Sequence, residues 1–208
     1  MSGFDGASMK AVATEAGVAQ SLLHYYYGNK ERLYIAMFER RALEMNDIRN
    51  ANLDHLVETG NPTVEEVLEI LLRQPMQLGR DGGANFPWLL MRVVLAGDEK
   101  STGMVSRAFD PFARRVIALL RQTLPGLSAR DAVWGYIFSL NVAMAMMAPT
   151  GRPQRLSGGE CDDRDVDGLL QNVVLFAAAG LRAFVARAAQ AKAVQPAGKR
   201  QRKGAAPA

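Results

Sequence analysis

Apolar residues recur at intervals of three and four positions along most of the chain, which predicts helices almost throughout. In one segment this spacing is kept by five aliphatic residues: Val64, Val67, Leu68, Leu71 and Leu72. Asn61 and Pro62 precede them in the order of an N-cap and a first helical residue. Asp110 with Pro111 predicts a second helix start of this kind. We find no strand pattern and no internal repeat, so an all-α fold is expected.

The last two predicted helices are apolar around much of their circumference. One begins at Ser128, which has a capping-box partner at Asp131, and continues through "AVWGYIFSLNVAMAMM". The other runs from about 165 to about 191. Such helices are buried on more than one side, either inside a bundle or against another chain. The Gly, Pro and Asp residues of 150–165 predict a loop between them.

Near the start, the pattern predicts two short helices joined by a glycine turn. Ser8 caps the segment "MKAVATEA", Gly17 ends it, and a second helix starts near Ala19 or Gln20. This arrangement is a helix-turn-helix. It leads into "LLHYYYGNK", in which four polar aromatic rings precede Lys30.

The second helix of this unit has a polar outer face. If Leu23 and Tyr27 face the core, the outer face carries four polar side chains: Gln20, Ser21, His24 and Tyr25. These types donate to and accept from base edges and phosphates, as the recognition helix of a DNA-binding unit requires. Lys30 would bind phosphate where the next helix begins. Tyr26 and Tyr27 suit core packing as well as they suit a surface.

The charge adds little to this picture. The net charge of +4 arises in residues 192–208, which hold five basic residues and no acid, whereas the other 191 residues carry 20 basic and 21 acidic side chains. The segment "QPAGKRQRKGAAPA" predicts a disordered basic tail. It either attracts DNA phosphates without regard to sequence or only keeps the protein soluble.

Composition argues against several classes of protein. One cysteine (Cys161) and two histidines (His24 and His55) predict neither a disulfide nor a metal site, and we expect no cofactor. No nucleophile elbow, phosphate loop or zinc-protease motif is present, so we do not expect an enzyme. Charges or glycines interrupt every long apolar stretch and no leader-like segment opens the chain, which predicts a cytoplasmic protein without a membrane partner.

The run "SMKAVATEAGVAQSLLHYYYGNKERL", residues 8–33, closely resembles the DNA-binding domain of the TetR family of bacterial transcriptional repressors. The resemblance implies that Ser8 and Lys30 hold phosphates. It also implies that five residues of the second helix lie against the groove and backbone of operator DNA: Gln20, Ser21, Leu22, His24 and Tyr25. Ala19 stands where the family usually has a Ser or Thr cap, and Leu22 where a Thr or small residue is common.

The resemblance also implies the domain organisation. We expect a DNA-binding domain over 1–45, a helical effector-binding and dimerisation domain over 46–191, and the tail over 192–208. The second domain is similar to those of a subgroup that includes fatty-acid-responsive repressors. Dimers of this family form through the final two helices, where the all-round apolar pattern lies, so a homodimer is expected.

Aromatic and methionine residues suggest the effector pocket. We expect an apolar or amphipathic ligand, acyl-like in the fatty-acid interpretation, because aromatic and thioether side chains suit such ligands. Arg92 and Asn141 are the polar groups expected to orient it. The full set is Phe86, Trp88, Met91, Arg92, Trp134, Phe138, Asn141 and Met144.

One element of the family pattern has no counterpart in the sequence. A helix normally precedes the glycine and aromatic that are here Gly3 and Phe4, and it covers the helix-turn-helix. We therefore expect Val12, Leu23 and Tyr27 to lose part of their cover. The functions that remain open are a ligand-responsive TetR-like repressor and, alternatively, a dimeric helical ligand-binding or adaptor protein with weakened DNA binding.

Overall fold

The computed structural model describes residues 6–78, 85–147 and 149–194, and over these residues the chain is helical without a strand. Its helices are α2 (Met9–Glu15), α3 (Gln20–Tyr27), α4 (Lys30–Thr59), α5 (Val64–Leu78), α6 (Asn85–Ala96), α7 (Glu99–Thr123), α8 (Ala129–Ala145), α9 (Arg152–Ser157) and α10 (Val166–Val194). The predicted all-α fold is confirmed. Residues 195–208 of the predicted tail lie outside the described residues.

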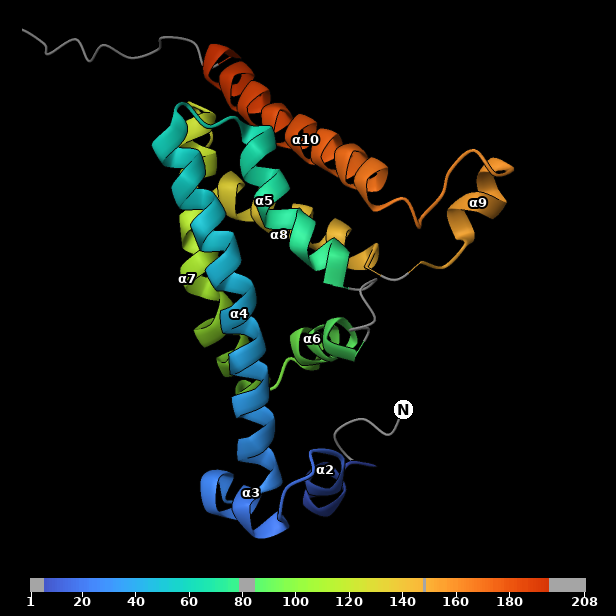
Figure 1. Ribbon diagram of the computed structural model, residues 1–208. Helices are drawn as coiled ribbons and strands as arrows, with labels where there is room; N and C mark the ends of the chain where they lie inside the picture. Colours follow the sequence, from blue (N-terminus) through green and yellow to red (C-terminus); the bar gives the residue numbers. More distant parts are fainter. Residues whose placement is uncertain (1–5, 79–84, 148, 195–208) are drawn as a thin grey trace, which may run out of the picture.

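Two short helices form a small unit at one end of the molecule (Figure 1). Ser8 caps α2, since its Oγ accepts from the Ala11 amide at 3.0 Å. Gly17 turns the chain toward α3 with a φ of 65°, a left-handed conformation that suits glycine. Asn29 caps α4 by accepting from the Arg32 amide at 2.9 Å. The local signals in the sequence therefore account for this helix-turn-helix.

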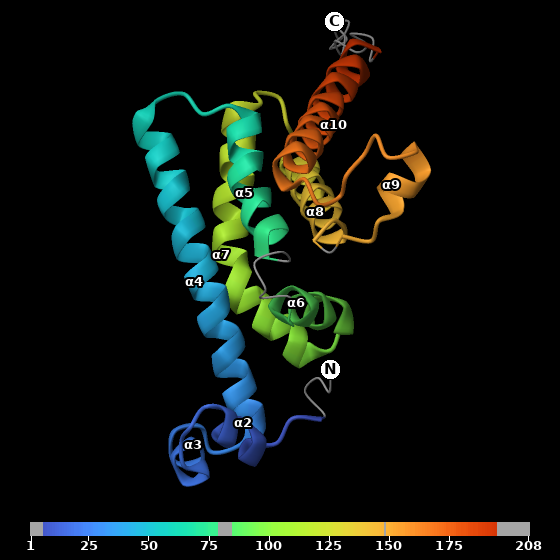
Figure 2. The ribbon, with the colours of Figure 1, turned by 45° about the vertical axis from the view of Figure 1, so that its right-hand side comes forward.

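Helix α4 extends from this unit to the far end of the molecule (Figure 1). It packs against α7 along much of its length and against α5, and α8 and α10 complete the bundle (Figure 2). The main core lies among these helices and includes Leu53, Leu68, Leu71, Leu120, Leu170 and Leu181. A second apolar cluster lies nearer to α2 and α3 and joins α4, α6, α7 and the end of α8.

Three predicted boundaries were wrong. Helix α5 begins at Val64 and not at Pro62, because Thr63 and Glu66 form a capping box there. Helix α7 begins at Glu99 under an Asp98 cap and continues through Pro111. Asp110, the expected cap, instead accepts from Ser106 and Arg114 within the helix.

The third correction concerns the predicted loop between the last two long helices. Part of it forms α9, bounded by Gly151 and Gly158, both in the left-handed conformation. The glycines that predicted a loop are therefore the two ends of a short helix. The start at Ser128 is confirmed, because its Oγ accepts from the Asp131 amide at 3.0 Å.

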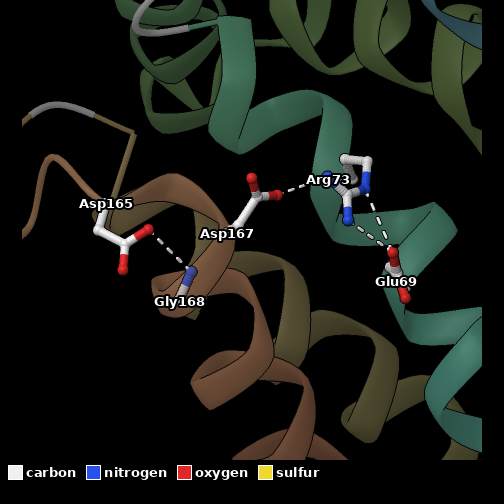
Figure 3. Close-up of polar contacts among 5 residues, drawn as sticks. All are labelled: Glu69, Arg73, Asp165, Asp167 and Gly168. Atoms are coloured by element: carbon white, nitrogen blue, oxygen red, sulfur yellow. Dashed lines mark hydrogen bonds and ion pairs between the residues drawn. The ribbon is translucent and has the colours of Figure 1, made fainter.

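Helix α10 is held against α5 by charge and against α8 by close packing. Arg73 of α5 donates to Asp167 at 2.8 Å and to Glu69 at 2.6 Å, while Asp165 accepts from the Gly168 amide where α10 begins (Figure 3). Gly135 of α8 has no side chain at the contact with Leu181, where a Cβ would lie 2.2 Å from a leucine methyl. The glycine therefore permits the close approach of α8 and α10.

Candidate nucleic-acid interface

Helix α3 presents a row of polar side chains to solvent. It has no buried residue, and only Leu23 and Tyr27 are partly covered. The residues predicted to meet nucleic acid are exposed together: Gln20, Ser21, Leu22, His24 and Tyr25. Tyr26 is also exposed, and its ring meets that of Tyr25 edge to face at 5.2 Å. The outer face deduced from the sequence is the face that the structure exposes.

His24 links the start of this helix to its end. Its Nδ1 lies 3.0 Å from the Gly28 carbonyl oxygen, so we assign the ring proton to Nδ1. The Nε2 atom then accepts from the Gln20 side-chain amide, 3.2 Å away. This contact leaves the Gln20 carbonyl and one amide hydrogen available to a base edge.

The residues predicted to hold phosphates lie at two helix starts beside α3. Lys30 is the first residue of α4, next to the Asn29 cap. Ser8 uses a lone pair to cap α2, and its hydroxyl hydrogen is still available to donate. Both side chains are thus set beside backbone amides, which favour anions.

Ion pairs connect α4 to α7 over much of their shared length. Lys100 pairs with Glu31 near the start of α4, Arg107 pairs with Glu39 at 3.3 Å, and Arg115 pairs with Asp54 at 2.5 Å. Helix α4 also carries α3 at its end. Helix α4 therefore connects α7 to α3.

The structure brings together only part of the predicted effector pocket. Phe86, Met91 and Met144 belong to the second apolar cluster, which we call the methionine cluster. Its buried members are Phe38, Leu90, Val93, Met104, Met144 and Met147, with Phe86, Met91 and Phe109 packed against them. The side chain of Trp88 lies outside the described residues.

Three predicted pocket residues lie elsewhere, so the structure does not bring the whole predicted set into one lining. Trp134 and Phe138 stack at 5.5 Å on the exposed side of α8, and Asn141 donates to the Ile137 carbonyl on the same side. Arg92 is exposed, and it lines a hollow of about 220 Å³ together with Val93 and Met104 of the methionine cluster. The apolar composition of α8 did not reveal which side faces the core.

The two long C-terminal helices, α8 and α10, both expose large apolar side chains. Helix α8 exposes Val133, Trp134, Ile137 and Phe138, and α10 exposes Leu175 and Phe176. By length and hydropathy Val166–Ala191 could also span a membrane, but core helices of soluble proteins pass the same test. Since the opposite side of α10 packs against α5 and α8, a protein interface explains its apolar surface better.

Arg49 is a polar residue of interest that the sequence interpretation missed. It falls in the buried series of α4 that includes Ala42, Met45 and Leu53, and only 3% of its surface is exposed. Its guanidinium lies 4.1 Å from the centre of the Phe112 ring. A basic residue in an otherwise apolar helical series was the signal that could have identified it.

Comparison with known families agrees with this arrangement. The profile of the bacterial regulatory proteins of the tetR family matches residues 2–37, which include α2, α3 and the start of α4. The profile of the tetracyclin repressor-like C-terminal domain matches residues 69–180, more than half of the chain. No curated protein sequence matches significantly.

Members of this family are regulators that bind DNA operators as dimers, with small-molecule effectors. The chain belongs to the tetR family and is a DNA-binding transcriptional regulator.

Proposed function

We propose that the chain acts in the cytoplasm as a homodimeric repressor whose two α3 helices read a pseudo-palindromic operator. The observation that carries this proposal is the exposed polar row on α3, placed between the anion-favouring starts of α2 and α4. Half-sites about one helical turn of DNA apart would fit a two-fold dimer. Residues 1–45 would form the DNA-binding domain and 46–191 the effector and dimerisation domain.

Gln20 is the proposed base-reading residue. It opens α3, and its amide is oriented by His24. A glutamine amide can accept from adenine N6 and donate to adenine N7 at the same time. The second amide hydrogen of Gln20 can still donate to His24, so the base contact requires no break in the contact between these side chains.

Substitutions of Lys30 and Gln20 separate phosphate binding from base reading. We expect Lys30→Ala to weaken binding to all sequences and to lower the salt dependence by about one phosphate. Gln20→Ala should instead change base preference, by about 1 to 3 kcal/mol at the contacted pair. Gel-shift titrations at several salt concentrations, on DNA from upstream of its own gene and on variant sites, measure both effects.

A second test variant lies on α3, and a matched control lies on α2. His24→Ala should reduce the discrimination provided by Gln20, whereas Glu15→Gln on the exposed end of α2 should leave base preference unchanged. A Lys30→Ala variant that altered base preference at an unchanged salt slope would show that we have the roles reversed. A wild-type chain without affinity for any of these fragments would instead favour the adaptor alternative.

We further propose that the effector is apolar, with an acyl-like chain that enters the methionine cluster. Methionine and phenylalanine side chains adapt to flexible apolar ligands, and this cluster joins α4 to α6 and α7. An effector regulates only if it prefers one arrangement of these helices. Saturated fatty acids and fatty alcohols of increasing length should therefore change tryptophan fluorescence and operator affinity. If every length left both quantities unchanged, the acyl proposal would be wrong.

A further inference from the structure

Arg49 occupies the junction between the two apolar clusters of the effector domain. Its guanidinium carbon lies 4.1 Å from the ring centre of Phe112 in the main core and 6.0 Å from that of Phe109, which packs on the methionine cluster. Only 3% of Arg49 is exposed. A positive charge is therefore buried at the junction of the two apolar clusters.

Arg49 has fewer partners than a buried guanidinium requires. One Nη2 hydrogen bond goes to the Asn46 side-chain oxygen, and Asn46 in turn donates to the Ala108 carbonyl. The Nε atom is buried without a partner. Among the described residues, no carboxylate lies within ion-pair distance of Arg49.

The buried environment of Arg49 disfavours the charged form of its guanidinium. Burial lowers the pKa of the Arg49 guanidinium to about 10, which still leaves it protonated at neutral pH. Stacking on Phe112 offsets part of that cost. Buried charges are normally paired, so an unpaired one suggests a missing anion.

Two further polar groups are buried in the same bundle, on α5 and α8. The Gln74 side-chain oxygen is also buried without a partner. The buried Tyr136 phenol of α8 is close enough for the charge of Arg49 to lower its pKa, although burial raises that pKa overall.

We propose that Arg49 is the anchor for the carboxylate of an apolar effector whose chain lies in the methionine cluster. Nε and an Nη of arginine can bind a carboxylate with two parallel hydrogen bonds, and Nε is the atom left unpartnered here. The Tyr136 phenol, whose raised pKa keeps it protonated, would be a further donor. This inference rests on the proposed apolar effector, and it adds the chemical class of the head group.

The position of Arg49 also explains how such a ligand would act on DNA binding. A chain that extends from Arg49 past Phe109 would reach Phe38, which belongs to α4, and Phe86, which belongs to α6. Displacing these rings would move α4 relative to α6 and α7. Since α4 carries α3, anion recognition at Arg49 would be converted into a change in the position of α3.

The test compares decanoate with 1-decanol, which share a chain and differ in the charge of the head group. Binding is measured by isothermal titration calorimetry on the full chain at neutral pH, below the micelle concentration. The wild type should bind decanoate at least about tenfold more tightly than 1-decanol, as a charge-assisted pair provides. Arg49→Met should reduce this ratio to about one, and Arg49→Lys should retain part of it.

Two features keep the result interpretable. Arg49→Met removes a buried charge and keeps an apolar side chain of similar length, so thermal unfolding should show a variant at least as stable as the wild type. Arg115→Met is the matched control, because it removes an arginine from the α4–α7 contact with Asn50 and Asp54, and it should keep the preference for decanoate.

Each of the other outcomes overturns a different statement. A wild type that binds both probes equally, or an Arg49→Met variant that keeps the preference, would make Arg49 a structural residue and leave the apolar effector in place. If neither probe bound, the acyl effector and its anchor would both be wrong. Gel-shift titration of the same preparation would then show whether the chain binds DNA, independently of the acyl effector and its anchor.

Discussion

A Phe138→Glu variant is expected to be monomeric where the wild-type chain is a dimer, and to lose most of its operator affinity. Phe138 is about half exposed on α8 and stacks on Trp134, within the apolar surface proposed as the dimer interface. Two-fold symmetry places the new carboxylate in that interface twice. At about 2 kcal/mol per copy, the dimer should dissociate roughly a thousandfold more readily.

The loss of operator affinity follows from the loss of linkage between the two α3 helices. A dimer binds its second half-site as an intramolecular event, and a monomer cannot do so, so gel shifts should require at least about a hundredfold more protein. Analytical ultracentrifugation measures the dimer directly. Leu43→Glu is the control, because Leu43 is comparably exposed on α4, away from α8 and α10. A Phe138→Glu chain that sedimented as a dimer would exclude this surface as the interface.

The helix-turn-helix could be predicted from the sequence because its signals are local. Ser8, Gly17 and Asn29 each determine a cap or a turn through contacts within a few residues. The outer face of α3 followed from the same spacing. Long-range packing was not needed to find either feature, so the sequence alone was sufficient.

The corrections arose where tertiary packing overrides local preference. Pro111 normally favours a helix start, yet α7 continues through it because Met104 on one side and Phe112 and Val116 on the other are buried in the two clusters. On α8, apolar residues lie all around the helix. Their pattern could not show that Met144 faces the core while Trp134 and Phe138 face outward.

The buried polar site around Arg49 could not be predicted from the sequence for a related reason. Arg49 and Tyr136 are on two helices that are distant in sequence, and the charge of Arg49 acts on the Tyr136 phenol only in the folded chain. In the sequence, Arg49 shows only as a basic residue in an apolar helical series. Its importance depends on burial and on missing partners, which are properties of the packed bundle.

Phe38→Ala is expected to have the largest effect on stability and to disconnect the proposed effector site from α3. Phe38 is fully buried, and its ring lies 5.9 Å from that of Phe86 and 6.1 Å from that of Phe109. Removing a buried phenylalanine ring costs about 3 to 5 kcal/mol. For a chain of this size the midpoint of thermal unfolding should fall by roughly 6 to 20 °C.

The regulatory effect is measured separately from stability, well below the unfolding transition. Phe38 is the buried α4 residue of the methionine cluster, so without its ring an apolar chain should no longer displace α4. We therefore expect 1-decanol to alter the operator affinity of the wild type and of Leu43→Ala, whose side chain is exposed on the same helix, but not that of Phe38→Ala. A Phe38→Ala variant that lost stability yet responded to 1-decanol as the wild type does would show that another contact transmits the signal, because the packing role of Phe38 would then be separate from regulation.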